Sequence, residues 1–271
     1  MALPSFYIPS YTAGQQEVLL DDDNSRHVVQ VLRMKPGELL QLTDGRGHLL
    51  EGEIVDAHKK QCRVAVRDVQ TIPPPLVDIT IAISPLKNAS RFEWFLEKAT
   101  EIGVASIVPL VCERTERQAV RTDRLRNILV SAMLQSQQVW LPILPDPQPF
   151  SQLIAQSGNH SQAAAGVTGL RLIAHCLEAP RPTATLADVV RKQEAATSGT
   201  MAVPAANAAS PVIPADRAGS GTLILIGPEG DFSPKEVETA LAAGYLPVSL
   251  GQNRLRTETA GIVAATLLCI K

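Results

Sequence analysis

The fold is decided by the stretch Leu223-Ile224-Leu225-Ile226-Gly227-Pro228-Glu229-Gly230-Asp231-Phe232-Ser233-Pro234-Lys235-Glu236. Its first four residues are wholly apolar and predict a buried strand, which runs directly into a loop with two glycines. The loop leads into a helix, with Ser233 as the expected N-cap, Pro234 as the first helical residue and Glu236 closing a capping box. A buried strand, a tight loop and a capped helix are typical of a parallel α/β sheet.

The two glycines allow a ligand to approach the backbone closely at the carboxyl end of a parallel strand. Open α/β sheets bind small molecules at that edge. An ordinary tight turn between a strand and a helix is the alternative interpretation. The loop is no P-loop, because the G-K-[ST] ending is absent.

A second stretch, residues 249–261, also joins a short strand to a helix. It carries Arg254 and Arg256 in the loop, and Thr257 is the expected helix cap. Gly261 falls in the first helical turn, where glycine costs about 1 kcal/mol relative to alanine. We therefore expect a close contact at Gly261, with another helix, with a bound cofactor or with the neighbouring loop.

The pattern changes along the chain at Pro73-Pro74-Pro75, which neither a ladder nor a helix can accommodate. Before the prolines, residues 39–42, 49–55 and 62–66 predict short strands of a small barrel. After them, strands at 77–83, 106–112, 170–175 and 222–226 alternate with helical stretches. The helices are expected from a Ser90–Glu93 capping box, from a Thr122 cap, and over 233–243 and 258–270.

The expected organisation is therefore a small barrel domain over 1–72 and an α/β domain over 73–271 with a mostly parallel sheet. Residues 195–221 consist mainly of Ala, Ser, Gly, Pro and Thr and predict a flexible surface insertion.

Composition excludes several classes of protein. The chain has 271 residues, a net charge of −2, 45% hydrophobic residues and 19% charged residues, which suits a folded protein better than a disordered one. No apolar run approaches the length needed to span a bilayer, and the first residues lack the features of a signal peptide. The four scattered cysteines predict neither a disulfide framework nor a metal site. We expect a cytoplasmic protein.

Several motifs together resemble one family. Gly227-Pro228-Glu229-Gly230, followed by Leu250-Gly251 and Leu255-Arg256-Thr257-Glu258-Thr259-Ala260, resembles the RsmE family of SPOUT-superfamily methyltransferases, which act on 16S ribosomal RNA. Residues 87–103 are similar to that family's first helix motif, and His27 with Val31-Leu32-Arg33 is similar to its N-terminal signature. The resemblance covers nearly the whole chain outside the segments rich in small residues.

The resemblance implies an RNA-binding, PUA-like β-barrel over 1–72 and a trefoil-knotted SPOUT methyltransferase domain over 73–271. It also implies a homodimer and S-adenosyl-L-methionine as cofactor. The expected cofactor-binding residues are His175, Gly227, Pro228, Glu229, Gly230, Leu250, Gly251, Leu255, Thr257 and Ala260. For His175, a buried structural histidine is the alternative. The helix over 258–270 is apolar nearly all round, so we expect it to be buried on several sides, one of them by a partner subunit.

The reaction implied is methylation of N3 of a uridine, which must lose its proton before transfer. A cation near O2 or O4 would stabilise the developing charge, and Arg256 is the candidate. Glu258 is the candidate to accept the proton or to orient Arg256; a carboxylate favoured by the helix dipole is the alternative.

Basic residues suggest where RNA binds. Five arginines fall between residues 114 and 126, opposed only by Glu116 and Asp123. They could form a solvated face or contact phosphates. The expected RNA-binding residues are Arg33, Lys87, Arg91, Arg114, Arg117, Arg121 and Gln135. Gln30 and Gln138 stand where the family usually carries a basic residue.

Three functions fit these patterns. The first is the uridine N3 methyltransferase, acting on 16S ribosomal RNA within the small ribosomal subunit. The second is a SPOUT enzyme with a different target, such as a ribose 2′-hydroxyl. The third is an RNA-binding relative that has lost turnover.

Overall fold

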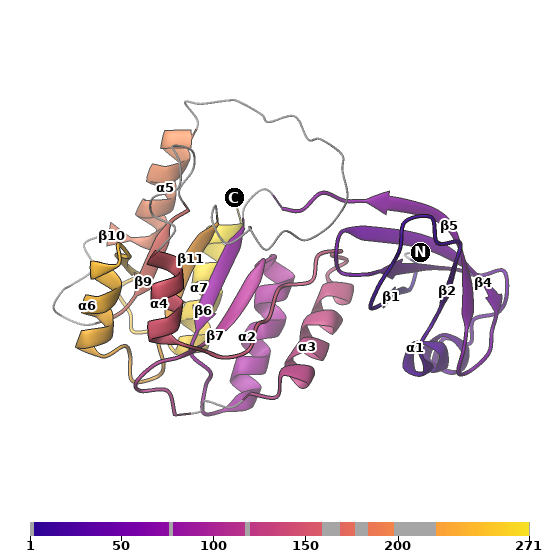
Figure 1. Ribbon diagram of the computed structural model, residues 1–271, viewed down its shortest axis with the longest axis horizontal. Helices are drawn as coiled ribbons and strands as arrows, with labels where there is room; N and C mark the ends of the chain where they lie inside the picture. The colour runs from indigo at the N-terminus through magenta and orange to yellow at the C-terminus, as the bar shows by residue number, and fades with distance from the viewer. Residues whose placement is uncertain are drawn as a thin grey trace. The chain divides into compact units, whose positions relative to one another are not determined.

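The computed structural model describes residues 3–75, 78–116, 120–158, 169–176, 184–197 and 221–270 (Figure 1). By its contacts the chain divides into two compact units. The first contains Met1–Pro74 and Val130–Leu141, and the second contains Pro75–Leu129 and Pro142–Lys271. Among the described residues, no helix is both long and apolar enough to cross a membrane.

The first unit is built on a five-stranded sheet in the order β1-β3-β4-β5-β2. Its elements are β1 Ser5–Tyr7, β2 Glu17–Leu19, α1 Asp22–Arg26, the π-helix His27–Val31, β3 Leu39–Thr43, β4 His48–Asp56 and β5 Arg63–Thr71. All pairs are antiparallel except β1 with β3. Leu40, Leu42, Leu50, Ile54 and Val64 are fully buried in its core. The strands predicted near 39–42, 49–55 and 62–66 are confirmed as β3, β4 and β5.

The segment Val130–Leu141 belongs to this unit because it pairs with the turn between β3 and β4. The Gly47 N–H donates to the carbonyl of Val139, and the Leu141 N–H donates to the carbonyl of Gly45, both at 2.9 Å. The Trp140 indole N–H donates to the carbonyl of Ile72 at 3.1 Å. The domain boundary expected at residue 73 is drawn from local sequence patterns, which contain no signal for this long-range pairing.

The second unit is built on a seven-stranded parallel sheet in the order β10-β12-β9-β11-β6-β7-β8. Its strands are β6 Ile79–Ile83, β7 Ser106–Val111, β8 Gln148–Pro149, β9 Arg171–Ala174, β10 Ala184–Thr185, β11 Thr222–Ile226 and β12 Leu246–Ser249. Its helices are α2 Ala89–Ile102, α4 Phe150–Gly158, α5 Leu186–Thr197, α6 Pro234–Ala242 and α7 Thr257–Cys269, and α3 Thr122–Gln135 begins here and ends in the first unit. The expected strand–helix alternation and parallel sheet are confirmed.

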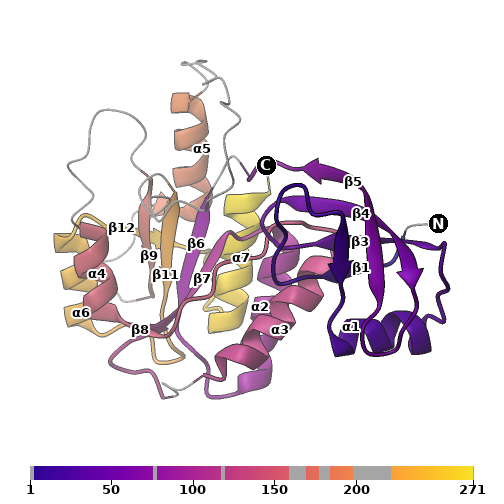
Figure 2. The same cartoon turned by 45° about the vertical axis from the view of Figure 1, so that its right-hand side comes forward.

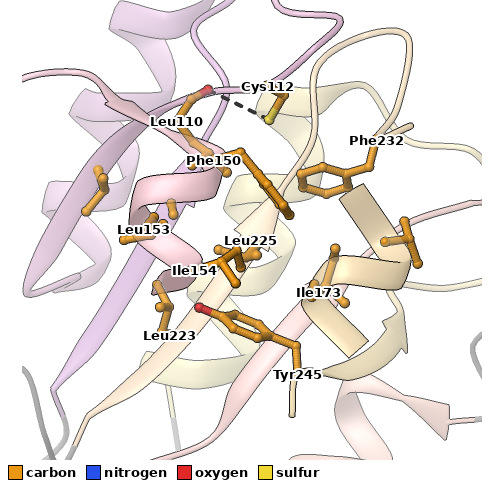
Figure 3. Packing of buried hydrophobic residues seen from close by; sticks show 14 residues of the cluster. Leu110, Cys112, Phe150, Leu153, Ile154, Ile173, Leu223, Leu225, Phe232 and Tyr245 are labelled. Atoms are coloured by element: carbon orange, nitrogen blue, oxygen red, sulfur yellow. Dashed lines mark hydrogen bonds between the residues drawn. The ribbon is translucent and has the colours of Figure 1, made fainter. Parts of the chain in front are cut away.

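Helices cover both faces of this sheet, with α4 and α6 on one face and α2 and α7 on the other (Figure 2). Alternate residues of β11 face opposite layers, as the two-residue period of a strand requires. Leu223 and Leu225 pack with Phe150, Phe232 and Tyr245 under α4 and α6, as Figure 3 shows.

The helix starts agree only partly with the sequence. The capping box of Ser233 and Glu236 with Pro234 is confirmed. The Ser90–Glu93 box is wrong, because Asn88 caps α2 and the Glu93 carboxylate instead binds the Arg124 guanidinium at 2.6 and 2.9 Å. Thr122 and Thr257 are the first residues of their helices and not caps; Arg256 is the N-cap residue of α7, without a side-chain hydrogen bond.

The expected insertion is also corrected at its start. Residues 195–197 form the last turn of α5, which the sequence did not predict, and residues 198–220 lie outside the described part of the chain. The other short elements that the sequence missed are β1, β2, α1, the π-helix, β8, α4 and β10.

The close contact expected at Gly261 is made with a helix and a strand. A Cβ at this position would lie 2.5 Å from the Phe95 ring of α2 and 2.9 Å from Cδ1 of Ile83 in β6. The absence of a side chain therefore lets α7 lie directly against α2 and the sheet.

Gly261→Val is expected to lower the free energy of unfolding by about 1–3 kcal/mol, because overpacking against Phe95 and Ile83 outweighs the gain in helix propensity. Urea denaturation measures it. Glu238→Ala, at an exposed position of α6, is the control and should change stability by less than about 0.5 kcal/mol. A more stable Gly261→Val protein would contradict the close approach.

Candidate functional site

A cavity of about 390 Å³ opens in the second unit at the carboxyl ends of β9, β11 and β12. Parallel strands end at the same edge, so three loops that are distant in sequence meet there. The lining residues are Arg91, Ala174, His175, Cys176, Ile226, Gly227, Pro228, Glu229, Asp231, Val248, Ser249, Leu250, Gly251, Asn253, Arg254, Leu255, Arg256, Thr257, Glu258 and Ala260. The volume falls within the range of small-molecule sites.

Nearly all the predicted catalytic and cofactor-binding residues lie together in this cavity. Gly230 is the exception, since it faces away from the lining and toward Arg114. The Arg114 guanidinium donates to the carbonyl of Gly230 at 2.8 Å. Arg114, predicted to bind RNA, is therefore hydrogen-bonded to the loop after β11.

The loop after β11 is also held from other directions. The Lys87 N–H donates to Oε1 of Glu229 at 3.4 Å. Glu236 accepts from its own cap residue, Ser233, and also from the backbone N–H of Glu113 at 2.9 Å. The strand-end loops of β6, β7 and β11 are thereby joined through polar contacts.

Sequence reasoning missed several lining residues, of which Asp231 is the most informative. Its φ is +62°, a left-handed conformation that costs an ordinary residue about 1–2 kcal/mol. Its carboxylate accepts from the N–H of Cys176 and from its own neighbour, Phe232, both at 2.8 Å. Cys176 is exposed and lines the cavity. In the sequence, only the turn composition at Gly230-Asp231 could have indicated the left-handed backbone of Asp231.

Glu258 is nearly buried at the start of α7, with 9% of its side chain exposed. Its Oε1 lies 3.8 Å from Nε of Arg91, so its ion-pair partner among the described residues is Arg91 rather than Arg256. The N-terminal turn of α7 also favours a negative charge there. Arg91, predicted to contact RNA, thus lies on the cavity wall beside the predicted catalytic carboxylate.

His175 has a buried side chain in the cavity wall, and neither of its ring nitrogens has a hydrogen-bond partner among the described residues. Burial lowers the pKa of His175, and the negative charge of Asp231 opposes that shift. A buried polar group without a partner is costly, so a ligand that supplies a partner would be favoured here.

The predicted RNA-binding residues are divided between the two units. Lys87, Arg91, Arg114 and Arg121 lie in the second unit, whereas Arg33 and Gln135 lie in the first. Arg117 lies outside the described residues. Lys87 forms an exposed ion pair with Glu116 at 2.9 Å; the hydrogen bond to Glu116 is the main cause that raises the pKa of Lys87.

Two family models match the chain. One, for an RNA methyltransferase domain, covers residues 73–269, and the other, for an RNA methyltransferase PUA domain, covers residues 20–67. The class that the sheet, the cavity and these matches define is that of RNA methyltransferases.

Individual relatives narrow the class. Ribosomal RNA small subunit methyltransferase E of Synechocystis is 28% identical, over 91% of this chain and 71% of the relative. A probable rRNA-methyltransferase from Porphyromonas gingivalis has a solved structure that is 40% identical, with a TM-score of 0.75 and coverage of 98% of both chains. A putative methyltransferase from Legionella pneumophila, solved with bound SAM, is 27% identical, with a TM-score of 0.74 and coverage of 99% and 97%. The chain belongs to the ribosomal RNA small subunit methyltransferase E family.

The buried imidazole makes stability depend on pH. Because the pKa of His175 is lowered in the folded state, the unfolded chain binds more protons below about pH 6.5. The free energy of unfolding should therefore fall as the pH drops from 7 to 5. His175→Asn should reduce that slope, by at most about 1.4 kcal/mol per pH unit.

Urea denaturation at a series of pH values measures the slope. His58→Asn removes an exposed histidine and should leave it unchanged. Equal slopes for wild type and His175→Asn would show that His175 titrates as in the unfolded chain.

Proposed function

We propose that the protein transfers a methyl group from S-adenosyl-L-methionine to N3 of a uridine in 16S ribosomal RNA. The observation that carries the proposal is the convergence of the loops after β9, β11 and β12 on one cavity. Membership of an rRNA methyltransferase family supports the substrate class. The bound SAM of the Legionella relative supports the cofactor.

The cavity fits this cofactor in its chemistry. It offers cations in Arg91, Arg254 and Arg256, and carboxylates in Glu229, Asp231 and Glu258. Such a balanced lining suits a ligand that carries a sulfonium, an ammonium and a carboxylate. His175 adds a buried imidazole that needs a partner. Gly251, where a Cβ would meet nothing within 4 Å, leaves the backbone accessible to the adenosyl part.

S-adenosyl-L-methionine supplies an electrophilic methyl group when bound. The chain must then hold the uridine so that N3 meets this methyl in line, which lowers the barrier by positioning. Arg256 is proposed to stabilise the negative charge that spreads onto O2 or O4 as N3 loses its proton. Glu258 is proposed to accept that proton, with Arg91 holding the carboxylate in place.

RNA binding is proposed to use the exposed cations Lys87, Arg114 and Arg121, together with Arg33 and Gln135 of the first unit. Phosphate contacts of this kind position an RNA without reading its sequence. The PUA match supports an RNA contact by the first unit. The substrate is proposed to be the small ribosomal subunit, which implies action in the cytoplasm.

The subunit arrangement is also a proposal. Helix α7 and its C-cap residue Ile270 carry a stripe that a single chain leaves partly or fully exposed: Ile262, Val263, Thr266, Leu267 and Ile270. Ile270 is 60% exposed. A second copy covering this stripe would bury apolar surface that is otherwise in water. We propose a homodimer through α7, with the trefoil knot that the family resemblance implies.

Arg256→Ala is expected to reduce single-turnover methylation of small-subunit particles about 100-fold or more, because the charge stabilising the uridine anion is lost. The dimer and cofactor affinity should remain within about threefold of wild type. Nucleoside mass spectrometry for 3-methyluridine, on particles from a strain without the gene, measures the product.

Arg191→Ala is the matched control, since Arg191 is an exposed arginine of α5 paired with Asp188. It should leave the product yield unchanged. A near-normal rate for Arg256→Ala would contradict the assigned role. A 2′-O-methylated product would favour the second function, and cofactor-independent RNA binding without any product would favour the third.

Thr266→Glu is expected to convert the dimer to a monomer, because it places a charge in the middle of the α7 stripe. Thr266 is exposed in the single chain, so the fold should tolerate the change. Sedimentation equilibrium measures the mass. Thr239→Glu on the exposed side of α6 should stay dimeric, and a monomeric wild type would refute the proposed interface.

A further inference from the structure

Asp231 adopts a left-handed backbone conformation, with a φ of +62°, which is uncommon for residues other than glycine. Among the described non-glycine residues with positive φ, which are Arg33, Gln137 and Asp231, only Asp231 lines the cavity. Strained residues that persist in a fold are held by their surroundings and concentrate at functional sites. The contacts of the Asp231 carboxylate therefore indicate what this strain achieves.

The carboxylate of Asp231 joins the ends of two neighbouring strands. Its Oδ2 accepts from the N–H of Cys176, which follows β9, while its Oδ1 accepts from the N–H of Phe232, in the loop after β11. Both bonds measure 2.8 Å, and the N–H of Asp231 donates back to Pro228 at 2.9 Å. β9 and β11 are paired in parallel up to Ala174 and Ile226, so the carboxylate continues their connection beyond the last paired residues.

His175 lies between the paired strand and this connection. It follows Ala174, the last residue of β9, and precedes Cys176, whose N–H is fixed by Asp231. Its imidazole is buried in the cavity wall and lacks a hydrogen-bond partner among the described residues. A ring that depends on a ligand for its partner gains most from being held in place before the ligand arrives.

We propose that Asp231 is a positioning residue for the cofactor cavity: its carboxylate fixes the end of β9 against the loop after β11 and so presets the imidazole of His175 for the ligand. The inference rests on the proposed function, because the ligand is taken to be S-adenosyl-L-methionine or its product. Asp231 acts through Cys176 and His175, and no contact of its own with the reacting atoms is required.

Three variants test the inference. Asp231→Gly relieves the left-handed backbone and removes both bonds, whereas Asp231→Asn tolerates the backbone but offers a single acceptor oxygen. Gln137→Gly is the matched control, since Gln137 has a φ of +56° and lies outside the cavity. S-adenosylhomocysteine is the probe for calorimetry, and hydrogen exchange at the Cys176 amide reports the connection without any ligand.

Asp231→Gly is expected to bind S-adenosylhomocysteine about tenfold more weakly, with Asp231→Asn about threefold weaker, although both melt within about 3 °C of wild type. The Cys176 amide should exchange at least about tenfold faster in Asp231→Gly. Gln137→Gly should leave affinity and exchange unchanged.

Two results would overturn the inference. One is an Asp231→Gly protein that binds the probe as tightly as wild type. The other is a Cys176 amide that exchanges at the same rate in wild type and in Asp231→Gly. A wild-type protein that binds neither S-adenosyl-L-methionine nor S-adenosylhomocysteine would instead refute the proposed function, and the positioning role with it, even if the Cys176 amide were protected.

Discussion

β11 pairs in parallel with β6 on one side and with β9 on the other, and all five of its residues are buried. A strand enclosed in this way needs apolar helices on both faces, and connections that return to the same end of the sheet. The loops that follow neighbouring parallel strands therefore come together at the carboxyl edge. The position of the cavity follows from this constraint before any loop residue is considered.

The loops at that edge must satisfy their polar groups without filling the cavity. Side chains outside the lining do much of this work, since Arg114 binds the carbonyl of Gly230 and Glu236 binds the N–H of Glu113. These contacts hold the loop after β11 from the side away from the cavity, so that its other side can face the cavity. A rigid loop of this kind costs a ligand little ordering entropy on binding.

The sequence predicts this edge well because its signals are local. Ser233, Pro234 and Glu236 specify a helix start within four residues, and four apolar residues specify the strand before it. The cap residues of α2, α3 and α7 are misplaced by one or two positions, and other failures concern contacts between residues distant in sequence. The Glu93 carboxylate binds the Arg124 guanidinium and does not close a capping box. The segment Val130–Leu141 belongs to the first unit because it pairs with the turn near Gly47. Very short strands such as β8 and β10 have too few residues to show a period.

Gly261 connects the packing of the second unit to its site. Because Gly261 has no side chain, α7 lies against Phe95 and Ile83, and the first turn of the helix is thereby fixed relative to the sheet. Glu258 lies in that turn, and Arg256 directly precedes it. The positions of both candidate catalytic residues in the cavity wall therefore depend on a packing contact in the core. Glycine costs stability inside a helix, but here it allows the close packing that holds the start of α7 at the carboxyl edge of β11.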